Sequence, residues 1–246
     1  MAYTEFSNGL ALGFRCMDGD FSAVVSGLPA SQTERRTLRV KFGDDDTDDT
    51  FWTTTTEPSV AVADMPAPLA RMFRRGGSLR LTVPRANSAG QDVTYAVDLP
   101  QSSVAIDETL TRCGKPLTDP RDVELNALAD GGLPMNLNWE TRPRLDFPRT
   151  DYARGFAVVS CIADQSGRAR DCVVESEHPH DGRFGRATLD GMNNARLTNL
   201  AQPGAPLRPS RFVFRAIFTV DGYQTDEERR ATSDDRRYVP TRRTSR

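Results

Sequence analysis

The chain has 246 residues, a formal net charge of −2 and a hydrophobic content of 37%. At about 100–150 residues per domain, this length predicts two domains, each with a modest core. The near-neutral balance of charge gives no reason to expect nucleic acid or an anionic membrane surface as a partner. No apolar run approaches the roughly 20 residues that a membrane-spanning helix needs, so we expect no membrane anchor within this chain.

The first residues and the cysteines indicate in which cellular compartment the protein is expected. Met1–Asn8 has neither the basic segment nor the apolar segment of a signal peptide. If the protein is exported, we therefore expect this chain to have been trimmed of a signal peptide or an N-terminal anchor. The four cysteines form no CxxC pair, and their even number predicts disulfides and an oxidising compartment.

Residues 1–115 are interpreted as a mostly-β or α+β domain. Apolar and polar residues alternate in several short segments, which is the pattern of half-buried strands. We expect strands at residues 10–16, 21–26, 38–42, 51–55, 79–83 and 93–97. Two helices are expected, one entered through Pro66 and Pro68 and one capped by Ser102 or Ser103.

Residues 116–138 are interpreted as a linker, because glycine and proline are frequent there. One short helix within Pro120–Asp130 is expected. At the other end of the chain, residues 224–246 consist mainly of charged and small polar residues, which predicts a disordered tail.

Residues 139–223 predict a second domain with the element order β-β-α-β. We expect its strands at residues 155–162, 171–176 and 212–220. Asp181 is expected to cap a helix whose apolar residues recur at helical spacing from Phe184 to Ala195. The alternation of apolar residues with other residues is clearest from Phe212 to Val220, and it places the phenylalanines on one face of the predicted strand. The fold class is therefore α+β, in two domains.

The four cysteines allow three pairings. Two cysteines lie in each half of the chain, which favours Cys16 with Cys113 and Cys161 with Cys172. Positions 161 and 172 are symmetric about a predicted turn near 165–167, so a hairpin would place them opposite each other at a distance that suits a disulfide. We interpret this second pair as a structural staple, with a redox switch as the alternative.

The second domain resembles a known family. Its elements read FPRTDYARGFAVVSC, ADQSGRARDCVVES, FGRATLDGMNNARL, AQPGAPLRPS and RFVFRAIFTVDGY. This order resembles the C-terminal periplasmic domain of TonB-type energy transducers over residues 139–223. Two features depart from the family pattern. The segment Leu197–Leu200 stands where an aromatic-rich segment usually follows the helix, and the pair Cys161–Cys172 is additional.

The resemblance implies a binding site for an extended peptide. In that family the last long strand is a sheet edge to which a segment of an outer-membrane transporter adds as a further strand. Mapped here, the edge is Arg211–Thr219, with the phenylalanines facing the helix. The implied outward-facing, partner-binding residues are Arg211, Val213, Arg215, Ile217 and Thr219. Arg211 and Arg215 either recognise an acidic partner or guard the edge against uncontrolled pairing.

Residues 9–113 are similar to the type VI secretion-associated VasI-like group of secreted domains. The similarity lies in GLALGFRCMDGDFSAVVS, VKFGDD, FWTTTT and a later helix that ends in Cys113. In those domains a cysteine of the first strand is joined to one after a C-terminal helix, which implies Cys16–Cys113. The implied function is an accessory or binding role in the envelope.

Other sites are poorly supported. Asp44–Asp49 lacks the glycine and the glutamate of a calcium loop and is interpreted as a hairpin tip. His178 and His180 share one predicted loop, so neither a metal site nor a nucleophilic triad is expected. Arg74–Gly77 is too short for a phosphate cradle and is interpreted as a helix end. We expect no enzyme activity and no cofactor.

The resemblances together imply a periplasmic protein that binds an extended transporter segment and supports energy-coupled transport across the outer membrane. The alternative is an envelope scaffold or accessory binding protein without energy transduction. The last strand could also pair two copies of the chain in a homodimer.

Overall fold

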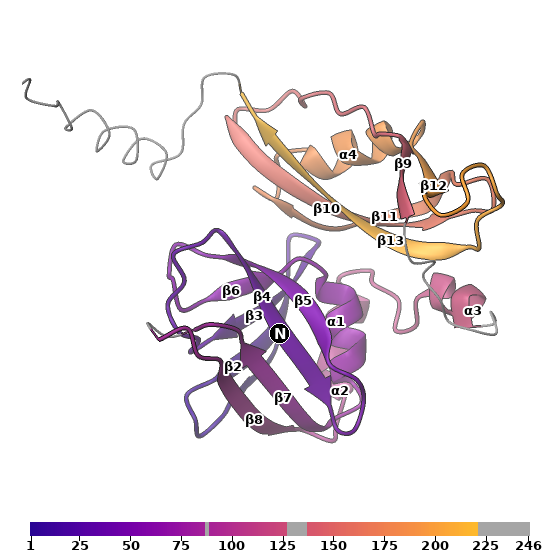
Figure 1. Cartoon of the computed structure of the whole chain (residues 1–246). Coiled ribbons are helices and arrows are strands. Elements are labelled where there is room, and N and C mark those ends of the chain that lie inside the picture. Colours follow the sequence, from indigo (N-terminus) through magenta and orange to yellow (C-terminus); the bar gives the residue numbers. More distant parts are fainter. Residues whose placement is uncertain (87–88, 127–136, 221–246) are drawn as a thin grey trace, which may run out of the picture.

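The structure is a computed structural model that describes residues 1–86, 89–126 and 137–220. Strands predominate and helices are few, in agreement with the predicted α+β class (Figure 1). The expected tail, residues 224–246, lies outside the described residues, as do residues 127–136 of the expected linker. In the described part, no helix is long and apolar enough to cross a membrane.

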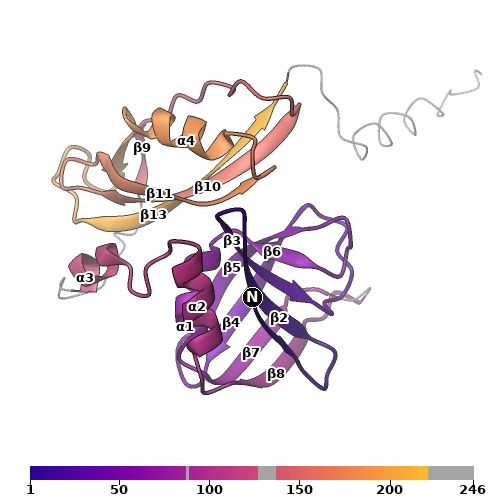
Figure 2. The same cartoon turned by 180° about the vertical axis from the view of Figure 1, so that it is seen from behind.

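The N-terminal part is an eight-stranded antiparallel sheet in the order β1-β2-β3-β6-β5-β4-β7-β8. Its strands are β1 (Ala2–Glu5), β2 (Ala11–Met17), β3 (Asp20–Ser26), β4 (Arg35–Phe42), β5 (Asp48–Thr54), β6 (Ala61–Ala63), β7 (Gly77–Val83) and β8 (Val93–Leu99). Helices α1 (Pro66–Phe73) and α2 (Val104–Arg112) lie together against this sheet (Figure 2). We call this part the N-terminal sheet.

The inward-facing residues of the N-terminal sheet form one hydrophobic core with residues of α1 and α2. Trp52, Phe21, Leu38 and Leu81 are at most 1% exposed, because the alternation seen in the sequence turns one face of each strand inward. The sheet is curled, so that β8 comes close to β3, which is not its neighbour in the strand order. The Tyr95 hydroxyl on β8 donates to the carbonyl of Gly27, next to the end of β3, at 2.9 Å. The predicted strands and both predicted helices are present.

Two short strands of the N-terminal sheet were not expected. β1 has four residues and β6 has three, which is too short for a clear alternation of apolar and polar residues. Both nevertheless pair with longer neighbours, β1 with β2, and β6 with β3 and β5.

The C-terminal part is a three-stranded antiparallel sheet in the order β11-β10-β13, which we call the C-terminal sheet. Its strands are β10 (Arg154–Ala163), β11 (Ala169–His178) and β13 (Ser210–Thr219), and helix α4 (Phe184–Met192) covers one face. β9 (Leu137–Thr141) and β12 (Arg196–Asn199) form a separate two-stranded ladder. The short helix α3 (Pro120–Asn126) lies near one end of β13 (Figure 1).

The expected order β-β-α-β is therefore incomplete, because β12 follows the helix. The segment Leu197–Leu200, read as a departure from the family pattern, contains most of this added strand. Leu197 is buried opposite Trp139 of β9, and the Trp139 ring packs edge-on against Phe212 and Phe214 of β13. The ladder thus extends the cover that α4 provides over the phenylalanine face of β13.

The N-terminus of α4 differs from the prediction. Asp181 does not cap the helix and instead accepts a hydrogen bond from the Tyr152 hydroxyl at 2.7 Å. The first turn is satisfied from β11, where the Glu177 carboxylate accepts the backbone N–H of Gly185 at 2.6 Å. Burial raises the pKa of Glu177, and the backbone N–H groups of the helix oppose that rise.

Both disulfides have the predicted pairing, Cys16 with Cys113 and Cys161 with Cys172. The first joins β2 to the residue that follows α2. The second crosses the β10–β11 hairpin at a register shift between Ser160 and Ile162, where Asp171 has a positive φ of 49°. This bulge turns the Asp171 carbonyl towards α3, as described below.

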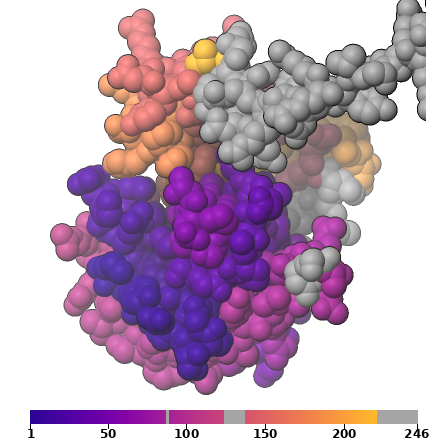
Figure 3. All heavy atoms as spheres, turned by 90° about the vertical axis from the view of Figure 1, so that its left-hand side faces the viewer, coloured from indigo at the N-terminus to yellow at the C-terminus, as the bar shows by residue number. Residues whose placement is uncertain are grey.

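Strand β10 is buried on both faces. Ala157, Val159 and Cys161 belong to the clusters beneath α4. The intervening residues, Phe156, Val158, Ser160 and Ile162, are also at most 8% exposed. The N-terminal sheet and α3 cover this second face of the C-terminal sheet, and in the space-filling view the N-terminal and C-terminal parts are in direct contact (Figure 3). The division into two domains at residues 116–138 stays a prediction.

Candidate functional site

The last strand, β13, is an edge of the C-terminal sheet. It is ten residues long, and among the described residues β10 is its one hydrogen-bonded neighbour. Because backbone groups of a strand point alternately to its two sides, every second residue of β13 directs its N–H and C=O away from β10. Phe212, Phe214 and Phe218 face the α4 side, as predicted.

Apolar side chains are exposed on the other face of β13. Val213 is 51% exposed and Ile217 is 57% exposed, and Thr219 at the end of the strand is exposed as well. Natural edge strands usually carry charges or bulges at such positions. An edge strand that exposes two β-branched apolar residues is well suited to receive a further strand.

Arg215 lies between these two residues in the sequence. It was expected to be exposed, but it is buried. Its side chain is 9% exposed and forms an ion pair at 2.8 Å with Asp64, which follows β6. The guanidinium also lies 3.7 Å from the centre of the Phe156 ring. Burial lowers the pKa of Arg215, and the Asp64 carboxylate opposes that shift. The expected edge arginine is therefore an internal contact between the two sheets.

Asp64 is the centre of this contact. Its carboxylate is 2% exposed and accepts hydrogen bonds from Arg35 at 3.1 Å and from Thr53 at 3.0 Å, besides that from Arg215. Its backbone carbonyl accepts the Ser176 hydroxyl of β11 at 2.8 Å. Asp64 thus joins β4 and β5 of the N-terminal sheet to β11 and β13 of the C-terminal sheet.

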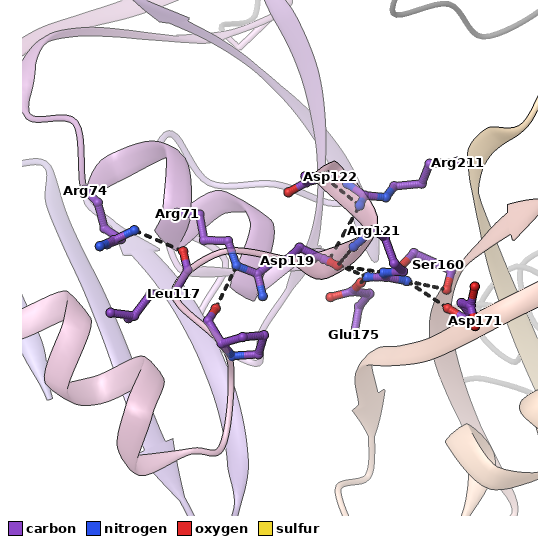
Figure 4. Close-up of polar contacts among 11 residues, drawn as sticks. Arg71, Arg74, Leu117, Asp119, Arg121, Asp122, Ser160, Asp171, Glu175 and Arg211 are labelled. Atoms are coloured by element: carbon purple, nitrogen blue, oxygen red, sulfur yellow. Dashed lines mark hydrogen bonds and ion pairs between the residues drawn. The ribbon is translucent and has the colours of Figure 1, made fainter. Parts of the chain in front are cut away.

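Arg211 is also held by the chain itself. Its side chain is 24% exposed, and its guanidinium lies 2.6 Å from the Asp122 carboxylate and 3.6 Å from that of Asp119, both near the start of α3 (Figure 4). The expectation that Arg211 and Arg215 would face outward at an exposed edge is wrong, because Arg211 pairs with α3 and Arg215 with Asp64, although Val213 and Ile217 on the same face are exposed.

A second buried cluster surrounds Arg121 of α3, and we call it the Arg121 cluster. The Arg121 guanidinium donates to Asp119 at 2.7 Å, to Glu175 of β11 at 3.3 Å and to the Ser160 hydroxyl of β10 at 2.9 Å (Figure 4). It also donates to the Asp171 carbonyl at 3.2 Å, and Ser160 donates to Glu175. The side chains of Arg121, Asp119 and Glu175 are 10%, 5% and 2% exposed.

The Arg121 cluster predicts a specific loss of stability in acid. Burial alone would raise the pKa of Asp119, but hydrogen bonds from Arg121 outweigh it and lower the pKa from 3.8 to about 2. A carboxyl group whose pKa is lower in the folded chain stabilises the fold above its unfolded pKa, and that contribution is lost as the pH falls towards the folded pKa. We expect the free energy of unfolding to fall between about pH 4 and pH 2, with a smaller fall in Asp119→Asn. Urea unfolding at several pH values measures both slopes, and equal slopes would contradict the assignment.

Apart from Arg215, which was predicted to bind a partner, the residues around Asp64 and Arg121 were not predicted as a site. Asp119 and Arg121 lie in the segment interpreted as a linker, and Glu175 is a single acidic residue in a strand. Among the described residues, no three His, Cys, Asp or Glu side chains form a group that could hold a metal ion. The binding role of Val213, Ile217 and Thr219 stays a prediction.

No protein-family model matches the sequence, and a search of curated proteins finds no match. Among solved structures, the solution NMR structure of the Pseudomonas aeruginosa TonB C-terminal domain is weakly similar, with a TM-score of 0.32 and 18% sequence identity. The match covers 37% of this chain and 92% of that one. The similarity of residues 9–113 to VasI-like domains finds no support in these comparisons.

Proposed function

We propose that the free edge of β13 binds an extended peptide by strand addition. The observation that supports this proposal is a ten-residue edge strand that exposes Val213 and Ile217, whereas its neighbour β10 is buried on both faces. Backbone N–H and C=O groups of β13 would supply most of the affinity, and the exposed side chains would contribute selectivity.

The TonB-like sequence pattern suggests the kind of peptide and the compartment. We propose a periplasmic protein whose partner is an outer-membrane transporter with an extended segment, in support of energy-coupled transport. The two disulfides suit an oxidising compartment such as the periplasm. Arg211 and Arg215 are already paired within the chain, so they would not select acidic residues in the partner.

The test is titration of the isotope-labelled protein with synthetic peptides from the N-terminal segments of outer-membrane transporters. We expect amide shifts along β13 and none along β11, the opposite edge. A peptide methylated at alternate backbone nitrogens should not bind, because it lacks the donors that a strand ladder requires. Shifts confined to β11, or equal binding of the methylated peptide, would contradict strand addition at β13.

A pair of variants tests the role of the side chains. Ile217→Lys should weaken peptide binding roughly fivefold, or by about 1 kcal/mol, because it removes an exposed apolar contact and adds an edge charge. Val173→Lys is the matched control, since Val173 is 37% exposed on the opposite edge strand. Equal losses in the two variants would point to a general effect of charge.

The buried contacts between the sheets favour a second candidate function. Asp64 joins the C-terminal sheet to the N-terminal sheet, and Arg121 joins it to α3, which is what a rigid envelope scaffold would need. In that case the TonB-like fold serves as a packing module, and no transporter peptide shifts the amides of β13.

A further inference from the structure

The two edge strands of the N-terminal sheet leave an opening between them. Within the described residues, β1 pairs with β2 alone and β8 pairs with β7 alone, so the curled sheet does not close into a barrel. Residues of β1 and the end of β8 nevertheless line one cavity of about 400 Å³, together with residues of α2. We call this cavity the seam pocket.

The floor of the seam pocket belongs to the hydrophobic core. Leu12, Phe14, Phe73 and Leu99 line it and are all at most 6% exposed. The Phe14 and Phe73 rings meet edge to face at 5.5 Å between centroids, and Phe6 completes an aromatic wall. A cavity with this lining is poorly suited to ordered water, which needs polar partners.

The rim of the seam pocket exposes apolar side chains. Tyr3 on β1 and Val104 on α2 are 56% and 61% exposed, although both are large hydrophobic residues. Ala105, on the same helix, lines the opening with a small side chain. The apolar surface is therefore continuous from solvent to the core, which is typical of ligand pockets of this size.

The charges around the seam pocket restrict what it could bind. The whole sequence has 32 lysine and arginine residues, yet none of the described residues that line the pocket is basic. The lining includes one carboxylate, that of Glu108 at the rim. An anionic head group would therefore find no cationic side chain and would be repelled by Glu108, which disfavours it relative to a molecule without negative charge.

We propose that the seam pocket binds a small apolar molecule without negative charge. The apolar part lies on Leu12, Phe14 and Phe73, and polar contacts are limited to the rim. The disulfide between Cys16 and Cys113 holds the end of α2 against β2 and so fixes one wall of the site. This site is separate from β13 and does not depend on peptide binding there.

Two matched fluorescent probes test the proposal on the full chain. N-phenyl-1-naphthylamine is uncharged, and 8-anilino-1-naphthalenesulfonate has the same ring skeleton with an added sulfonate. We expect saturable binding of the uncharged probe at one site, and binding of the sulfonate weaker by about fivefold or more. Glu108→Gln should narrow that difference by strengthening sulfonate binding. Equal affinity for the two probes, or no saturable binding of the uncharged one, would overturn the proposal.

A variant at the rim locates the site. Ala105→Trp should weaken binding of the uncharged probe by about tenfold or more, because the indole fills the opening. Thr111→Trp adds the same side chain at an exposed position of α2 outside the pocket and should change nothing. Circular dichroism and thermal unfolding check that both variants fold. Unchanged probe binding in Ala105→Trp would place the bound probe elsewhere and refute the assignment.

Discussion

Arg121→Met is expected to lower the free energy of unfolding by about 3–5 kcal/mol, because it leaves the buried Glu175 carboxylate without its cation and removes the nearest cation of Asp119. Glu175 would keep the Ser160 hydroxyl as its described partner in this cluster. Asp119 would keep the backbone N–H of residue 121 at 3.0 Å and the longer contacts to Arg71 at 3.4 Å and Arg211 at 3.6 Å. Methionine has a similar length, so the loss would report the missing charge more than a missing volume. Equilibrium unfolding in urea, followed by circular dichroism, measures the change.

The control for this prediction is Arg186→Met. Arg186 pairs with Asp190 one helical turn away, but the two side chains are 77% and 55% exposed. An exposed pair of this kind contributes at most about 0.5 kcal/mol. The double variant Arg121→Met with Glu175→Gln should recover part of the loss, because the second change removes the unpaired charge. If the two single losses simply add, Arg121 and Glu175 do not act as one unit.

The ion pairs of Arg211 and Arg215 also limit how β13 could bind a peptide. Arg211 and Arg215 fasten the outer face of β13 to α3 and to Asp64, so an added strand could approach only in the plane of the sheet. Its side chains on that side would then pass close to the N-terminal sheet. Partner selection by the proposed site would therefore depend on both sheets, although the edge belongs to one.

The sequence predicts the elements whose pattern is long and regular. The alternation of phenylalanines from Phe212 to Phe218 identifies β13 and its buried face, and the spacing from Phe184 to Met192 identifies α4. The symmetric positions of Cys161 and Cys172 about a turn predict their pairing. β1, β6 and β12 were missed, since three or four residues show no period and these strands form through their pairing partners.

The contact between the two sheets was missed for a different reason. Hydrophobic pattern shows which face is buried, but it does not identify the partner of a buried charge such as Asp64 or Arg121. One signal was present, because the run GFAVVSCIA in β10 is apolar at successive positions. A strand with that pattern is buried on both faces, so something besides α4 has to cover it.

Removal of the Cys16–Cys113 disulfide by alanine substitution is expected to lower the free energy of unfolding by about 4–5 kcal/mol. The two cysteines are 97 residues apart, and the cross-link therefore removes much of the conformational freedom of the unfolded chain. The chain supplies its own matched control, because Cys161 and Cys172 are 11 residues apart and the same model predicts a loss about 2 kcal/mol smaller. Urea unfolding of the two double alanine variants under one set of conditions gives the comparison. An equal or larger loss for the short loop would mean that local packing at Cys161, which is fully buried, outweighs chain entropy.

The Cys16–Cys113 variant should also bind the uncharged probe more weakly, because α2 forms a wall of the seam pocket and this disulfide fixes its end.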